Sequence, residues 1–236
     1  MELPQNKTWY SSEGSKLAEL WTVLHLPYTV MCLSFLTIGF ALEKINNESL
    51  YIWTVIAYFF GLGISAHCFD QLKGMGSSYV KHLTQTELFI IGLFSLVISL
   101  AIGTTIMLVY SKWNLIWLMP LQAFFVLSYP VAKLFKGIFH TDFWFAVSFG
   151  AVPVIVGYYI NTDSFTLISS MWAVLCFSLS YMEITLSRYV RKRRKEGANI
   201  EYYNKPEKAL KILCALSYLL ALIVLLSSST HIYLSK

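Results

Sequence analysis

A histidine and a carboxylate stand three residues apart at the end of a long apolar run. His67 and Asp70 lie where the apolar residues of 51–69 give way to a polar stretch. Residues three apart on an α-helix lie on the same face. Ionisable groups at membrane depth are costly, and they usually face a bundle interior or a watery cavity. The spacing therefore favours a polar site at the end of a helix. The alternative is that the two side chains mark where the helix meets lipid headgroups.

Similar polar groups stand at the ends of other apolar runs. His140 and Asp142 precede one run, and Glu183 ends another. Mg²⁺ prefers carboxylate oxygens and often takes substrate phosphates into its shell, whereas two histidines would better suit a transition metal. We expect catalytic roles for His67, Asp70 and Glu183, with Asp70 and Glu183 holding a phosphate-bridged Mg²⁺. A hydrogen-bonded polar patch at helix ends is the alternative.

The densest charge in the chain is the basic stretch 188–195. Such a stretch commonly sets topology and binds anionic lipids. Arg188 and Arg191 are three apart, so both could turn inward and bind a diphosphate through bidentate hydrogen bonds. We expect no nucleic-acid binding, because the stretch adjoins a membrane helix and lacks a folded reading module. The expected substrate-binding residues are Lys73, Arg188, Arg191, His140 and Asp142.

The composition indicates that these groups are positioned by membrane helices. Of the 236 residues, 56% are hydrophobic and only 13% are charged, against about 25% charged in soluble domains. A spanning helix needs about 20 apolar residues. We expect one all-α membrane domain with about seven transmembrane helices. The apolar runs cover residues 23–42, 51–69, 88–110, 113–134, 143–160, 165–184 and 209–229.

The basic residues predict the orientation of the bundle, because cytoplasmic loops carry an excess of Lys and Arg. With a cytoplasmic N-terminal segment (1–22), the basic loop 185–208 is cytoplasmic as well. The opposite side then carries only Lys44, Lys112 and Lys236. We therefore expect an integral protein of the cell membrane with its N-terminus inside and its C-terminus outside.

Three stretches of the chain resemble the UbiA superfamily of intramembrane prenyltransferases. Residues 24–28 (Leu-His-Leu-Pro-Tyr) resemble the start of that family's first helix. Residues 142–158 resemble its segment with Gly, Pro and Gly-Tyr after the fourth helix. Residues 65–74 and 181–197 follow the second and sixth runs, where the family keeps two acidic motifs.

The resemblance implies a UbiA-like bundle that lacks the last two helices. It implies an enzyme acting on an isoprenoid or lipid, most simply by prenyl transfer from a prenyl diphosphate to a lipophilic acceptor, with Mg²⁺ and membrane lipids as partners. Here Asp70 alone remains of the first acidic motif, and the second position has Glu183 followed by basic residues. These departures motivate an alternative, a catalytically degenerate bundle that serves as a lipid- or quinone-binding or structural subunit of a membrane complex. Transport is a third reading, although no inverted repeat is evident.

Overall fold

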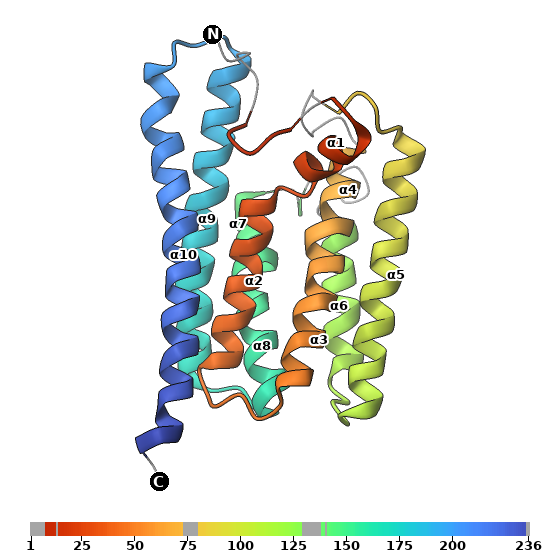
Figure 1. Cartoon of the computed structure of the whole chain (residues 1–236), viewed down its shortest axis with the longest axis vertical. Helices are drawn as coiled ribbons and strands as arrows, with labels where there is room; N and C mark the ends of the chain where they lie inside the picture. The colour runs from red at the N-terminus through yellow and green to blue at the C-terminus, as the bar shows by residue number, and fades with distance from the viewer. Residues whose placement is uncertain (1–7, 13, 73–79, 129–137, 140, 235–236) are drawn as a thin grey trace.

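The computed structural model describes residues 8–12, 14–72, 80–128, 138–139 and 141–234, which form a helical bundle (Figure 1). Two π-helical segments, η1 and η2, each interrupt a longer helix. The elements are α1 (Lys16–Val23), α2 (Leu26–Ala41), α3 (Glu48–Tyr58), η1 (Phe59–Ser65), α4 (Ala66–Gln71), α5 (Gln85–Val109), α6 (Leu115–Ser128), α7 (Asp142–Ala146), η2 (Val147–Ala151), α8 (Val152–Thr162), α9 (Leu167–Lys195) and α10 (Glu201–Leu234).

Within the described part of the chain, five helices are long and apolar enough to cross a membrane. α1 and α2 together would make a sixth span, bent by 45°. The expected count of seven is not confirmed, because α6 has only 14 residues and the run 113–134 continues beyond the described residues. The five spans are Glu48–Leu72, Gln85–Val109, Asp142–Thr162, Leu167–Lys195 and Glu201–Ser228.

Polar side chains define where several of these helices begin. The Asn47 side chain accepts a hydrogen bond from the Leu50 backbone N–H at the start of α3. Thr84 and Glu87 form a capping box at the start of α5. Such caps pair backbone donors that have no partner within the helix. They explain why α3 and α5 start a few residues before the apolar runs 51–69 and 88–110.

α2 and α8 pack together at backbone distance. A Cβ atom on Gly39 would lie 2.2 Å from the Val154 carbonyl oxygen, and one on Gly157 would lie 2.3 Å from the Leu36 carbonyl oxygen. Small residues allow membrane helices to approach this closely. The α2–α8 pair is therefore a fixed centre for the bundle.

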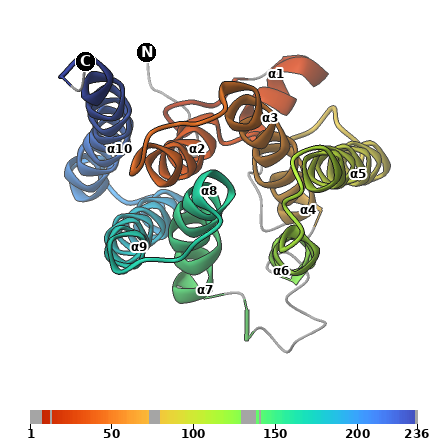
Figure 2. The ribbon, with the colours of Figure 1, turned by 90° about the horizontal axis from the view of Figure 1, so that it is seen from below.

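Two apolar cores flank this central pair. One side of α2 packs with α3, α5 and α6, and the other side packs with α9 and α10. Figure 2 shows the arrangement along the bundle, with α9 and α10 on one side of α2 and α8 and with α3, α5 and α6 on the other.

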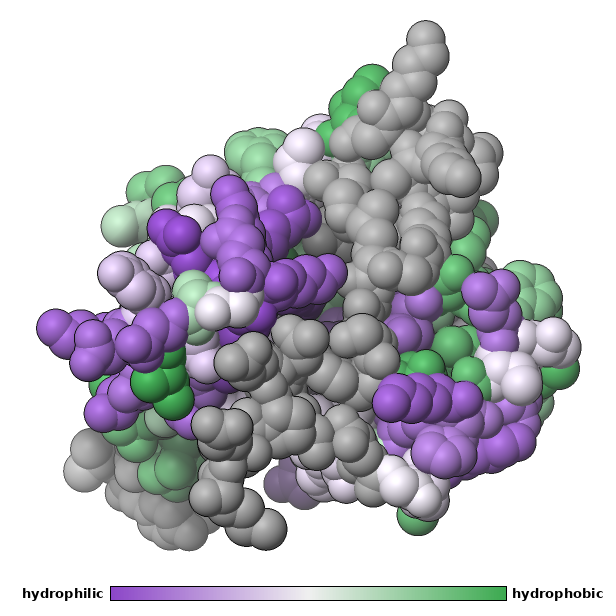
Figure 3. Space-filling model, turned by 90° about the horizontal axis from the view of Figure 1, so that it is seen from above, coloured by the Kyte–Doolittle hydropathy of each residue, from purple (hydrophilic) through white to green (hydrophobic). Residues whose placement is uncertain are grey.

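One end of the bundle gathers the polar residues, and we call it the basic end. α1, the end of α4, the start of α7 and the α9–α10 connection all lie there (Figure 1). Seen from this end, hydrophilic residues cover much of the described surface (Figure 3). α9 has 29 residues and is about 43 Å long at 1.5 Å per residue. It exceeds the roughly 30 Å hydrocarbon layer, so its basic end extends beyond the apolar region.

Candidate functional site: a polar cavity at the basic end

A cavity of about 370 Å³ opens among the helices at the basic end. One wall comes from α9, and the other comes from α2, α4 and α7–η2. The polar lining residues are His25, Tyr28, His67, Asp70, Glu183, Ser187, Arg188, Arg191 and Lys195. The cavity thus brings together all the candidate catalytic residues and both candidate arginines.

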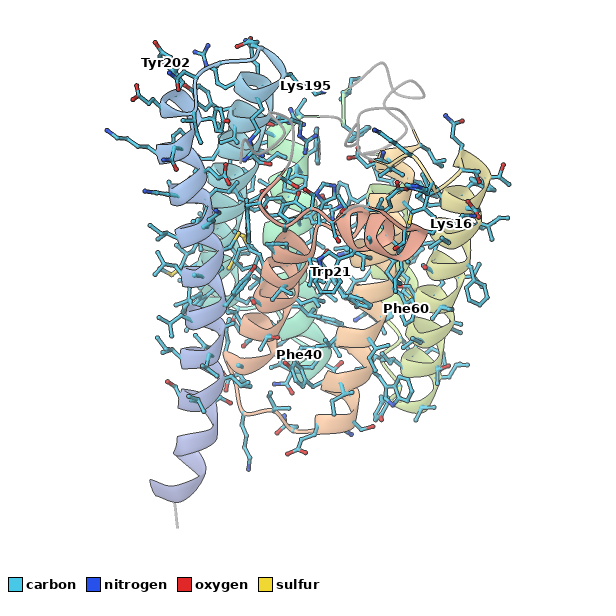
Figure 4. The ribbon with its side chains drawn as sticks, turned by 45° about the horizontal axis from the view of Figure 1, so that its top comes forward. Lys16, Trp21, Phe40, Phe60, Lys195 and Tyr202 are labelled. Atoms are coloured by element: carbon cyan, nitrogen blue, oxygen red, sulfur yellow. The ribbon has the colours of Figure 1, made fainter. Side chains whose placement is uncertain are left out.

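The α9 wall is one face of a single helix. Glu183, Arg188 and Arg191 are spaced so that all three reach the cavity. Lys195, labelled in Figure 4 near the end of α9, is the outermost of them. Glu183 is only 2% exposed, and its Oε1 atom has no hydrogen-bond partner among the described residues. The wall therefore combines a buried carboxyl group with three cations.

Asp142 lies behind this wall rather than on it. Its Oδ1 atom is 2.6 Å from Arg188 Nη1, and neither side chain is fully buried. Asp142 is not among the lining residues. Asp142 therefore contacts an arginine that does line the cavity, and its own contact with a substrate stays a prediction.

His67 and Asp70 lie on the opposite wall. They share one face of α4, as their spacing predicts, and both line the cavity. His67 is 8% exposed, and its Nε2 atom has no hydrogen-bond partner in the described part of the chain. The π segment η1 ends just before α4. A π segment adds a residue to the turn and is frequent at functional sites, and η1 lies directly before the face of α4 that lines the cavity.

Apolar side chains line part of the same cavity. Phe145 and Phe149 stack with ring centroids 4.6 Å apart and planes 6° apart. The His67 ring lies 5.8 Å from Phe149. Ala66 and Ile184 complete the apolar lining. The site is therefore amphipathic, with charged groups and an aromatic surface in one space.

The segment before α2 closes over this end of the bundle. Glu19 of α1 is 1% exposed, and its carboxylate accepts hydrogen bonds from the backbone N–H groups of Lys81, His82 and Leu83 at 2.7–2.9 Å. Lys16 of α1, labelled in Figure 4, pairs with Glu87 at the start of α5. These contacts fix α1 against the loop that leads into α5.

Within the described residues, no group of three or more His, Cys, Asp or Glu side chains is arranged to hold a metal ion. Asp70 and Glu183 are nevertheless two carboxyl groups on one cavity, and Mg²⁺ commonly uses one or two carboxylates together with substrate phosphates. The donor set thus fits an ion bridged by a phosphate ligand but forms no protein cage. Lys73 and His140 lie outside the described residues.

Sequence reasoning missed part of the lining. His25 had been read only as part of a helix start, and Tyr28 and Lys195 had no role. His25 directly precedes Leu26 and Pro27 at the start of a helix, so its position beside a helix break was a usable signal. Nothing in the sequence indicated the Glu19 contacts with the loop 80–83.

The described residues form an all-helical fold with several apolar helices of membrane-spanning length, as is typical of integral membrane proteins. A scan against models of known protein families found no match, and searches of curated proteins and of solved structures found no similar chain either.

Proposed function

We propose that this chain is a UbiA-like membrane enzyme that binds an isoprenoid or related lipid with a phosphate or diphosphate head in the basic-end cavity. Its simplest reaction is prenyl transfer to a lipophilic acceptor. One observation carries the proposal: buried Glu183 and His67 each have a polar atom without a partner among the described residues, in a cavity lined by arginines. A buried polar group without a partner costs free energy, so a polar ligand in this cavity would be favoured.

The head of the ligand would contact the α9 wall. Arg188 and Arg191 present planar donor groups that match phosphate oxygens. The ion pair with Asp142 orients Arg188, and Lys195 adds a third positive charge. A dianionic or trianionic head therefore suits this wall better than a neutral hydroxyl.

The apolar part of the ligand would lie against Phe145, Phe149 and Ile184. The stacked phenylalanines present aromatic surface to the cavity. Aromatic faces attract cations, so this surface would stabilise an allylic cation that forms beside it.

In prenyl transfer, the bond between the allylic carbon and the diphosphate oxygen breaks, and its electron pair leaves with the diphosphate. Arg188, Arg191 and Lys195 would stabilise that leaving charge. An electron-rich acceptor carbon then bonds to the allylic cation, and the acceptor loses a proton to His67, or to Glu183 when that carboxylate holds no metal ion. A Mg²⁺ ion held by Asp70 and Glu183 would supply further neutralisation of the diphosphate.

The test uses purified protein in lipid nanodiscs with farnesyl diphosphate and a hydroquinone acceptor. We expect release of inorganic diphosphate with formation of the prenylated acceptor. Glu183→Gln and Arg191→Gln should each lower turnover at least about tenfold, since the first removes a carboxyl group that could accept a proton and the second removes a guanidinium donor.

Arg193→Gln is the matched control, because Arg193 lies on the same helix but pairs with Glu196 outside the cavity. Absence of both binding and turnover in the wild-type protein would refute the proposal.

A lipid- or quinone-binding or structural subunit is the second candidate. The observation that favours it is the donor set: Asp70 and Glu183 are the acidic side chains among the described residues that line the cavity. The family that the chain resembles has two acidic motifs. Under this reading, native mass spectrometry would detect a retained isoprenoid or quinone, or co-purifying subunits, while the same assay would release no diphosphate.

A further inference from the structure

His25 has an unusual backbone conformation for a residue with a side chain. Its φ of 44° and ψ of 47° place it in the left-handed region, directly between α1 and α2. This conformation is unfavourable for a residue with a Cβ atom. Strained residues of this kind cluster at functional sites, where the surrounding structure holds them. The His25 ring lines the basic-end cavity and is 9% exposed.

A tyrosine from the N-terminal segment holds this ring. Tyr10 Oη lies 2.5 Å from His25 Nδ1. The Tyr10 ring also packs edge-on against His25 and Tyr28, with centroids 5.6 Å apart in each pair. A phenol O–H donates readily, and a neutral imidazole accepts on whichever nitrogen carries no proton. Donation from Tyr10 to Nδ1 leaves the imidazole proton on Nε2.

The segment that carries Tyr10 is itself fixed in place. Ser12 and Thr22 exchange two hydrogen bonds, at 2.8 Å and 2.9 Å. Lys211 Nζ lies 5.3 Å from the Trp9 ring centroid. The Tyr10 hydroxyl is therefore held by contacts on both sides of it in the sequence.

The other groups that line the cavity indicate which kind of ligand atom would accept a hydrogen bond from His25 Nε2–H. His67 lies beside His25, with ring centroids 4.9 Å apart. Arg188 and Arg191 line the same cavity from α9. An N–H donor on His25 would add to the guanidinium donors of Arg188 and Arg191. An anionic oxygen is the ligand atom that can accept hydrogen bonds from all of these groups.

We propose that Tyr10 positions His25 with its proton on Nε2, and that His25 Nε2–H donates to a phosphate oxygen of the ligand. The second part rests on the proposed function. Tyr10 itself is a positioning residue, and His25 is the residue that contacts the ligand. The N-terminal segment is then part of the ligand site.

The first test is the ¹⁵N NMR spectrum of histidine-labelled protein, in which protonated and unprotonated ring nitrogens give widely separated shifts. We expect the Nε2–H tautomer for His25, assigned by its loss in His25→Gln. Tyr10→Phe should give a mixture of tautomers with an unchanged thermal unfolding midpoint.

Tyr51→Phe is the control, because it removes a partly buried hydroxyl that bonds Thr37 outside the cavity. A wild-type proton on Nδ1, or an unchanged His25 tautomer in Tyr10→Phe, would overturn the positioning role.

The second test measures binding of farnesyl diphosphate, inorganic diphosphate and farnesol in nanodiscs. Asn tolerates the left-handed backbone conformation, but His25→Asn removes the hydrogen-bond donor at the Nε2 position. This substitution should therefore weaken farnesyl diphosphate binding about tenfold or more. His25→Gln places an amide N–H near the Nε2 position and should stay within about threefold of the wild-type affinity. In the wild-type protein, farnesyl diphosphate should also shift the His25 Nε2 signal, a readout that needs no variant.

The outcomes separate the two proposals. Binding to the wild-type protein with no loss in His25→Asn and no shift of His25 Nε2 would overturn the role of His25 and leave the proposed function standing. If neither diphosphate probe binds the wild-type protein, the proposed function and the phosphate contact both fail. Equal binding of farnesol and farnesyl diphosphate would also refute the phosphate contact.

Discussion

At the scale of single residues, Glu19 makes the most extensive polar contact of α1. Its carboxylate accepts from three backbone N–H groups and from the His82 ring. Glu19→Ala would remove the acceptor that these donors share, and a hydrogen bond to a charged group contributes about 1.5–3 kcal/mol. We expect a fall of about 2–5 kcal/mol in the free energy of unfolding, measured by denaturant titration in detergent.

Glu201→Ala is the matched control for that measurement, because Glu201 is an exposed glutamate at the start of α10. Exposed substitutions of this kind usually change stability by less than about 0.5 kcal/mol. An equal effect of the two changes would contradict the role given to the Glu19 carboxylate.

Sequence reasoning predicted some cavity residues and not others, for a physical reason. The shared face of His67 and Asp70 follows from helix geometry alone, which is local. Whether His67 and Asp70 share a cavity with Glu183 and Arg191 depends on how α4 packs relative to α9. From the sequence alone, this proximity was only an expectation. His25 was missed because its side-chain contacts with Tyr10, fifteen positions away in the chain, and with His67 form only in the folded chain, although its place just before Leu26 and Pro27 was a usable local signal.

At the scale of elements, the α2–α8 crossing depends on glycine. In Gly157→Ala the added methyl would meet the Leu36 carbonyl oxygen at 2.3 Å, and backbone cannot move aside as a side chain can. Overpacking typically costs about 1–3 kcal/mol. We expect a loss of this size in the free energy of unfolding.

Gly103→Ala is the control for the crossing. The nearest atom to its added methyl is the sulfur of Met119, at 2.5 Å. Met is flexible enough to adapt, and the better helix propensity of Ala offsets part of the strain. A loss as large as that of Gly157→Ala would show that the crossing is not the sensitive contact.

The boundaries of some helices were predictable, but α9 ends at Lys195 rather than at residue 184, and α10 starts at Glu201 rather than at residue 209. The run 88–110 corresponds to Gln85–Val109, because apolar length and a capping box are both local signals. The bend at His25 and the π segments were not predicted. At η1, a Cβ on Gly61 would lie 2.8 Å from Ser99 Oγ, and one on Gly63 would lie 2.7 Å from Thr29 Cγ2. The close packing of this segment therefore involves residues distant in the sequence.

At the scale of the whole molecule, the orientation predicted from the basic residues can be measured by cysteine labelling. The native Cys32, Cys68, Cys176 and Cys214 are all buried, so background labelling should be low. With the basic end inside the cell, an impermeant maleimide added to intact cells should label Lys44→Cys and not Glu201→Cys. Inside-out vesicles serve as the control and should give the opposite result. Labelling of Glu201→Cys in intact cells would refute the orientation.

The two apolar cores on either side of α2 and α8 have a thermodynamic consequence. His67 and Asp70 belong to the half that contains α4, whereas Arg188 and Arg191 belong to the half that contains α9. A ligand that contacts both halves would link them, and its binding free energy would add to the free energy of unfolding of the whole bundle. At a free concentration of one hundred times Kd, the gain is about 2.7 kcal/mol, so melting scans could rank candidate compounds without knowledge of any reaction. Arg191→Gln should diminish that gain, whereas Arg193→Gln should preserve it.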